Sequence, residues 1–112
     1  MTFNTILETT GSVTQICLSG ELNAATAPVF KEQLEKAALM NPKHLVLLMR
    51  DLQYMASAGL RMLIFAKQKM GVDVVIYLIK PQAMVMDTIE KTGFHHSVII
   101  MDEYDATKIE TL

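Results

Sequence analysis

Ser57 is the residue whose setting most favours a chemical role. It lies within the run YMASAGL, between an apolar segment at 44–49 and a periodic one that starts at 58. Its small neighbours leave the hydroxyl open to another protein. A phosphate attached there would meet the free N–H groups and the positive dipole end of the helix that follows. In the alternative interpretation, the Ser57 oxygen caps this helix by accepting from the N–H of Gly59 or Leu60, and local physics alone favours that cap.

The other polar clusters favour structural roles. His95 and His96 are adjacent, and on an extended segment they point to opposite sides, so they do not form a chelating pair. The acidic residues near the C-terminus fit the first turn of a helix, where the dipole stabilises carboxylates; they are Asp102, Glu103 and Asp105. The five glycines form no phosphate-binding motif. We therefore expect no catalytic residues, no cofactor and no metal, and hence no enzyme.

The composition predicts one folded domain that spans residues 1–112. Hydrophobic residues make up 51% of the chain and charged residues 20%, with a net charge of -2. The chain has no basic cluster, which argues against direct nucleic-acid binding. Its longest apolar runs, such as 74–79, are too short to cross a bilayer, and the N-terminus does not resemble a signal peptide. The single cysteine, Cys17, is expected to be a buried reduced thiol, which suits the cytoplasm.

The apolar pattern predicts alternating strands and helices around Ser57. A short turn at 9–12 joins the first two strands into an antiparallel hairpin, and Thr26 is the expected N-cap of the first helix. The expected strands are 3–8, 13–18, 44–49, 74–79 and 98–101, the last three buried, and the expected helices are 27–40, 58–70, 81–92 and a short one that Asp102 caps and that carries Tyr104, Ile109 and Leu112. This β-β-α-β-α-β-α-β-α order predicts an α/β fold with a mixed, mainly parallel sheet and about four helices.

Two motifs carry a family resemblance: SGELN at 19–23 and YMASAGL at 54–60. Together with their order and separation, they make the chain resemble a STAS domain over nearly its whole length. STAS domains occur in sulfate transporters and in anti-sigma factor antagonists. Because the chain has no transmembrane segment, the resemblance is to the stand-alone antagonists.

The resemblance implies a switch at Ser57. In the family, the serine two places before the glycine of the second motif is phosphorylated by an anti-sigma factor that is also a serine kinase of the GHKL type. The unphosphorylated antagonist binds this kinase and releases the sigma factor, and a PP2C-type phosphatase restores binding after phosphorylation. With Gly59 as that glycine, Ser57 is the phosphoacceptor. The implied partner-binding residues are Asn23, Ser57, Ala58, Gly59, Leu60 and Arg61.

The sequence departs from the family pattern at two places. Ala56 stands where the family often has an acidic or hydroxyl residue, and Leu48 stands where many relatives carry Asp or Asn. Fewer carboxylates near Ser57 reduce the repulsion of a phosphate. The rival interpretation is a STAS scaffold or small-ligand-binding module in which Ser57 is only a cap. In either case we expect a cytoplasmic protein without membrane contact, as a monomer or weak dimer.

Overall fold

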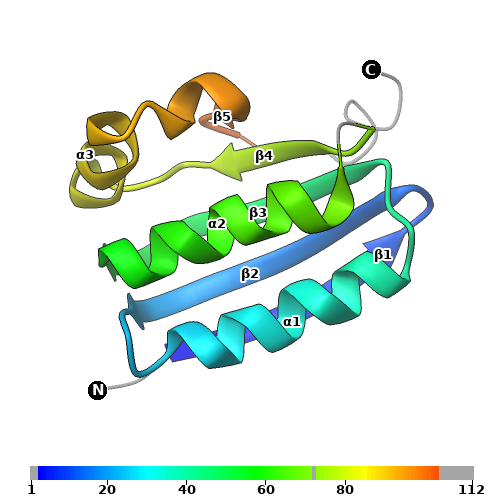
Figure 1. Ribbon diagram of the computed structural model, residues 1–112, viewed down its shortest axis with the longest axis horizontal. Helices are drawn as coiled ribbons and strands as arrows, with labels where there is room; N and C mark the ends of the chain where they lie inside the picture. The colour runs from blue at the N-terminus through cyan, green and yellow to red at the C-terminus, as the bar shows by residue number, and fades with distance from the viewer. Residues whose placement is uncertain (1–2, 72, 104–112) are drawn as a thin grey trace.

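The sheet forms the centre of the molecule (Figure 1). The computed structural model describes residues 3–71 and 73–103. Within them, the elements are the strands β1 (Phe3–Thr10), β2 (Val13–Leu22), β3 (His44–Met55), β4 (Val75–Ile79) and β5 (Ile99–Met101), the helices α1 (Ala27–Leu39), α2 (Ser57–Met70) and α3 (Ala83–Lys91), and the 3-10 helix η1 (Phe94–Ser97). The predicted last helix lies outside the described residues.

The strands are arranged in the order β1-β2-β3-β4-β5. The first two form an antiparallel hairpin whose ends pair Phe3 with Gly20 and Thr10 with Val13. Gly11 has a positive φ of 59°, the conformation that tight two-residue hairpin turns require. All other neighbouring strands are parallel. The mainly parallel sheet with one N-terminal hairpin is therefore confirmed.

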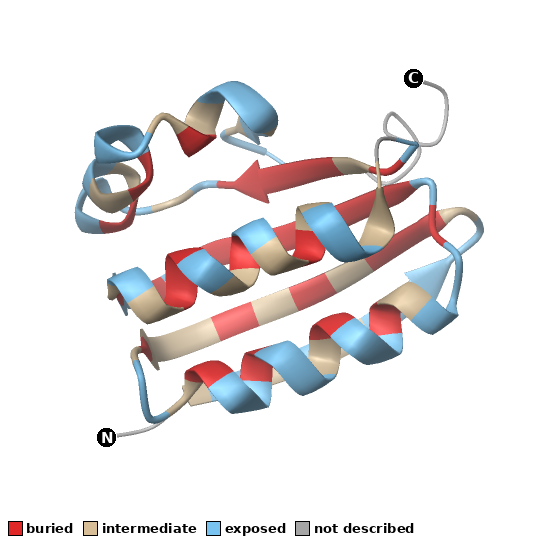
Figure 2. Cartoon of the chain, in the orientation of Figure 1, coloured by how far each residue is buried: buried red, intermediate tan, exposed pale blue. Residues whose placement is uncertain are grey.

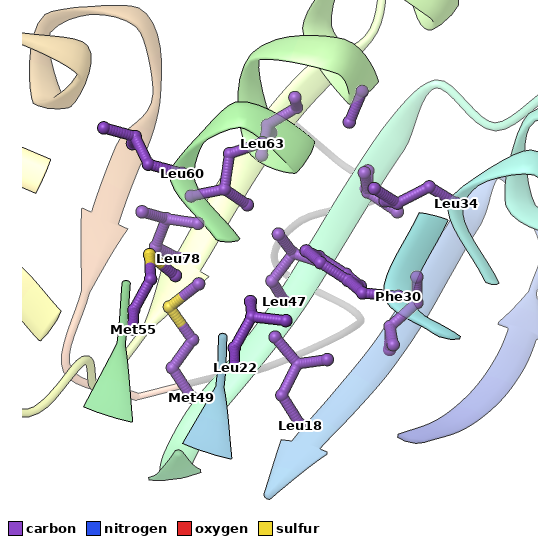
Figure 3. Close-up of a cluster of buried hydrophobic side chains, with 14 of the residues drawn as sticks. Leu18, Leu22, Phe30, Leu34, Leu47, Met49, Met55, Leu60, Leu63 and Leu78 are labelled. Carbon is purple, nitrogen blue, oxygen red and sulfur yellow. The ribbon is translucent and has the colours of Figure 1, made fainter. Parts of the chain in front are cut away.

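Helices α1 and α2 lie side by side on one face of the sheet (Figure 1). Each turns a buried stripe toward the strands and an exposed one toward solvent (Figure 2). The core lies between these layers, where Phe30 and Leu34 of α1 and Leu60 and Leu63 of α2 meet the strands (Figure 3). Helix α3 adds residues to the same cluster, so all three helices share one core; its contributions are Val85 and Ile89. The opposite face holds a smaller buried cluster of Val13, Val46, Tyr77 and Ile79.

Strands β2 and β3 are longer than predicted. They run on to Leu22 and Met55, whereas the expected strands ended at 18 and 49. The added part of β3 alternates poorly, because its pairing with β2 shifts twice, between Cys17 and Ser19 and between Gly20 and Glu21. Such irregularities break the two-residue period by which a strand is identified in a sequence.

Two further expectations near the C-terminal end are wrong. The last strand was expected to be buried, but Ile99 and Ile100 of β5 are 43% and 37% exposed because β5 is an edge strand. His95 and His96 do not lie on an extended segment. They belong to the 3-10 helix, which places their ring centroids 3.9 Å apart.

Candidate functional site

Ser57 is the first residue of α2 and is exposed. The N-cap of the helix is Ala56, whose carbonyl accepts from the N–H groups of Gly59 at 2.9 Å and Leu60 at 3.2 Å. The Ser57 side chain makes no capping hydrogen bond, so the predicted cap is wrong. The physical reason is a shift by one position, because a capping side chain must belong to the residue before the first helical one. The Ser57 hydroxyl therefore does not cap α2.

Two backbone N–H groups in the first turn of α2 have no backbone acceptor among the described residues. Gly59 and Leu60 donate to Ala56, while the N–H groups of Ser57 and Ala58 have no backbone acceptor in the part of the chain that the structure describes. Free N–H groups at a helix start, together with the helix dipole, stabilise a negative charge. The start of α2 is thus suited to an anion on the Ser57 oxygen.

The loop before α1 is fastened by the side chain of Asn23. Its Oδ1 accepts from the N–H of Ala25 at 3.0 Å and of Thr26 at 3.1 Å. Thr26 is the N-cap residue of α1, as predicted, but its side chain makes no capping bond to the helix. Its hydroxyl instead donates to the carbonyl of Glu21 at 2.9 Å and accepts from the N–H of Asn23 at 2.9 Å. Either Asn or Asp can accept these bonds, and Asn keeps the loop uncharged.

The two sequence motifs meet at the carboxyl ends of β2 and β3. The N–H of Ala56 donates to the carbonyl of Leu22 at 2.8 Å, which joins the end of one strand to the start of α2. Gly59 makes this approach possible: a Cβ there would lie 2.6 Å from Cγ of Leu22 and 3.0 Å from Cγ of Met55. Figure 1 shows the loop between β2 and α1 at the same end of the molecule as the start of α2.

The six predicted partner-binding residues divide by exposure. Ser57 and Arg61 are exposed, and Asn23 and Ala58 are half-buried, so these four can be reached from outside. Gly59 and Leu60 are buried, Leu60 within the main core (Figure 3). Gly59 and Leu60 therefore lie beneath the surface and pack the start of α2 against the core.

One methionine, Met84, is exposed, although its place in a helix that packs on the sheet favoured core filling. It is 62% exposed on the first turn of α3. One turn later, the Thr88 hydroxyl lies 3.3 Å from the carbonyl of Met55, which ties α3 to the end of β3 just before Ser57. The signal in the sequence was a large apolar residue next to the buried stripe of a helix, since Val85 and Ile89 face the core while Met84 does not.

The charges around the site are sparse. Arg61 forms no ion pair within residues 3–71 and 73–103, where the salt bridges are Lys36–Glu32 and Lys91–Asp87. Leu48 lies within β3, on the sheet face opposite the helices. Ala56 contributes only its backbone. Of the six predicted partner-binding residues, five are uncharged and Arg61 carries a guanidinium.

The histidines offer no metal centre in the described part of the chain, where no three metal-ligating residues gather. His44 is buried and its Nδ1 lies 3.1 Å from the Tyr77 hydroxyl. Burial raises the pKa of Tyr77, which keeps this phenol protonated. These observations assign His44 to the packing of the sheet. No helix among the described residues is both long enough and apolar enough to span a bilayer.

The comparison with protein families identifies the fold. The STAS domain family matches residues 4–107. The chain belongs to the STAS domain family. The match contains both SGELN and YMASAGL, the motifs that meet at the carboxyl ends of β2 and β3.

Solved structures agree with this assignment. An anti-sigma factor antagonist from Mycobacterium paratuberculosis has a TM-score of 0.87 at 20% identity, over 97% of this chain and 93% of that one. The anti-sigma factor antagonist SpoIIAA in its unphosphorylated form has a TM-score of 0.80 at 16% identity, over 96% and 95%. The phosphorylated form of the Bacillus cell fate determinant SpoIIAA has a TM-score of 0.73 at 16% identity, over 96% and 98%. These similarities concern the fold. No curated protein sequence matched the chain.

Proposed function

We propose that this STAS domain is a cytoplasmic anti-sigma factor antagonist without catalytic activity of its own, and that it acts by partner switching. It binds an anti-sigma factor that is a serine kinase of the GHKL type. Phosphorylation of Ser57 ends this binding, and a PP2C-type phosphatase restores it. The observation that carries the proposal is the exposed Ser57 hydroxyl, which begins α2 without capping it.

The docking surface comprises the exposed or half-buried Asn23, Ser57, Ala58 and Arg61. We extend it to the exposed Met84 of α3, because Thr88 of this helix contacts the carbonyl of Met55, two residues before Ser57. Small side chains around Ser57 permit the close approach that transfer of a phosphoryl group to its oxygen requires. The rigid loop of Asn23, held by bonds to Ala25 and Thr26, offers the partner a fixed shape. Met84 supplies an apolar contact of the kind often found in interfaces.

A phosphate on Ser57 adds a charge of about −1.5 to −2 to this mostly neutral surface. In the unbound protein, that charge is stabilised by the free N–H groups of Ser57 and Ala58 and by the guanidinium of Arg61. Helix α2 therefore keeps its structure. Docking would bury the phosphate, and its desolvation opposes binding. The switch therefore acts on the surface and leaves the fold unchanged.

The phosphorylation step is tested with the purified protein, its cognate kinase, ATP and magnesium, followed by mapping of the modified residue. We expect phosphate on Ser57, and no labelling of Ser57→Ala. Ser97→Ala is the matched control, because Ser97 is also an exposed serine but lies in η1. Full labelling of Ser57→Ala would overturn the assignment.

The rival function, a constitutive scaffold, is favoured by one feature, the alanine at position 56. The scaffold interpretation also treats Ser57 as the helix cap, and this part is wrong, since Ala56 is the N-cap and Ser57 makes no capping bond. Ser57→Asp separates the two functions. Partner switching predicts that the added carboxylate weakens kinase binding at least tenfold, about 1.4 kcal/mol, while Ser57→Ala binds normally. A scaffold would bind its partner equally well with either substitution.

A further inference from the structure

A second candidate site lies on the face of the sheet that the three helices leave free. It is a pocket of about 520 Å³, within the range of about 300–1,000 Å³ usual for small-ligand sites. Ile79 belongs to the buried cluster of that face and the half-buried Leu48 packs against it, whereas their neighbours Leu47 and Leu78 point to the helices. The lining residues are Cys17, Leu48, Arg50, Asp51, Ile79, Lys80, Asp102 and Glu103.

The position of the pocket in the sheet fits a ligand site. Lys80 directly follows β4 and Asp102 directly follows β5, so the pocket opens at the carboxyl ends of these parallel strands. Open α/β sheets bind ligands at this edge. The site is separate from the Ser57 surface, which lies on the helix-covered face.

The lining has two kinds of surface. Cys17, Leu48 and Ile79 supply an apolar part, and Cys17 and Leu48 are paired neighbours on β2 and β3. The remaining residues are charged, with two cations, Arg50 and Lys80, and three carboxylates. None of these five charges forms an ion pair within the described residues. Both signs of charge are therefore available to a ligand.

The edge of the pocket is held in an unusual conformation. Lys80 has a positive φ of 53°, which non-glycine residues rarely adopt. Its N–H donates to the carbonyl of Met101 at 2.7 Å, and the amide of Gln82 donates to the carbonyl of Arg50 at 2.8 Å. Strained residues persist where the surroundings fix them, and they gather at functional sites. These bonds hold the Lys80 backbone between β3 and β5.

We propose that this pocket binds a small zwitterion with an apolar body, such as a short peptide with apolar side chains. Its carboxylate pairs with Arg50 and Lys80, its ammonium group pairs with the carboxylates, and its body covers Cys17, Leu48 and Ile79. A simple anion would face three carboxylates, and an uncharged apolar molecule would leave five charges without a partner. A molecule that carries both charges offers a partner to the cations and to the carboxylates of the lining.

The test uses Cys17 as a reporter, because it is the single cysteine of the chain and lines the pocket. Burial, Asp51 and Glu8 raise the pKa of this thiol, so its alkylation by iodoacetamide is slow. It is therefore followed by intact mass over several hours at about pH 7, below the α-amino pKa of about 7.7–8.0, so that Leu-Leu keeps its ammonium group. The probe is the dipeptide Leu-Leu, at up to about 10 mM, which is above a weak Kd of about 1 mM. We expect it to slow alkylation at least threefold in a saturable manner. N-acetyl-Leu-Leu and Leu-Leu amide, which each carry one charge, should protect much less.

Variants assign the effect to the pocket. Lys80→Asn removes a charge and suits the positive φ, and Arg50→Gln removes the other cation. Both should lose the protection by Leu-Leu while an unchanged circular dichroism spectrum reports an intact fold. Lys43→Gln is the control, since Lys43 lies at the opposite end of β3. Unchanged alkylation rates in wild type with Leu-Leu, equal protection by the singly charged analogues, or full protection in both pocket variants would each overturn the proposal.

Discussion

Helices α1 and α2 begin at the same end of the sheet, after β2 and β3, yet their starts are fastened in opposite ways. Before α1, the side chains of Asn23 and Thr26 satisfy backbone groups of the loop through four hydrogen bonds between 2.9 and 3.1 Å. Before α2, Ala56 contributes only backbone groups, its N–H to Leu22 and its carbonyl to the first turn, and the hydroxyl of Ser57 lies one position too late to cap. The start of α1 is held by side-chain hydrogen bonds, and the start of α2 has no side-chain capping bond.

This difference teaches how a serine stays available at a helix start. Serine is a good N-cap, and in the cap position its oxygen would be bound to a backbone N–H. A shift by one residue frees the oxygen, and packing must then hold the helix start in place. Gly59, pressed against Leu22 and Met55, supplies that packing.

The largest effect is expected at Gly59. Gly59→Ala places a methyl group 2.6 Å from Leu22 Cγ, so the start of α2 must move away from β2. We expect a loss of about 1–3 kcal/mol in the free energy of unfolding, measured by urea denaturation. The control is Ala58→Gly, the reverse substitution at the neighbouring, half-buried position. An unchanged stability of Gly59→Ala would contradict the role of packing.

The next effect concerns the start of α1. Asn23→Ala removes the acceptor for the N–H groups of Ala25 and Thr26, and should cost about 0.5–2 kcal/mol in urea denaturation. Asn23→Asp keeps the acceptor and should stay close to wild type in stability. If both variants were equally destabilised, the hydrogen bonds of the loop would not be the cause.

The smallest effects sharpen the contrast at α2. Ala56→Ser places a hydroxyl in the true cap position and should stabilise the protein by about 0.5–1 kcal/mol. Ser57→Ala removes a hydroxyl that caps nothing, so the midpoint of urea unfolding should hardly move. A loss of about 1 kcal/mol in Ser57→Ala, the usual cost of removing a cap, would restore the capping role to Ser57.

Much of the fold could be predicted from the sequence. The apolar run 44–49 and the periodic segment 58–70 each predicted an element that the structure contains, and β3 and α2 meet there. The extension of β3 to Met55 was missed, because two register shifts displace its apolar residues from strict alternation. The last strand was predicted, but its exposure was not, because edge and central strands can have the same apolar composition.

The docking surface that both motifs imply stays a prediction, whereas the structure does bring the two motifs together. Their contact depends on a long-range approach of Gly59 to Leu22 that no local pattern contains. The cap of α2 was misplaced by one residue, a difference set by the backbone of Ala56, which is extended at φ −86° and ψ 172°. Met84 was missed because its proximity depends on how α3 packs against β3.

The central claim is that a phosphate on Ser57 changes binding while the fold stays the same. The most direct measurement is the affinity for the cognate kinase of one preparation before phosphorylation, after it, and after treatment with the phosphatase. We predict that phosphorylation raises Kd at least tenfold, that the phosphatase restores the first value, and that the circular dichroism spectrum is unchanged throughout. Equal Kd values for the two forms would contradict the account.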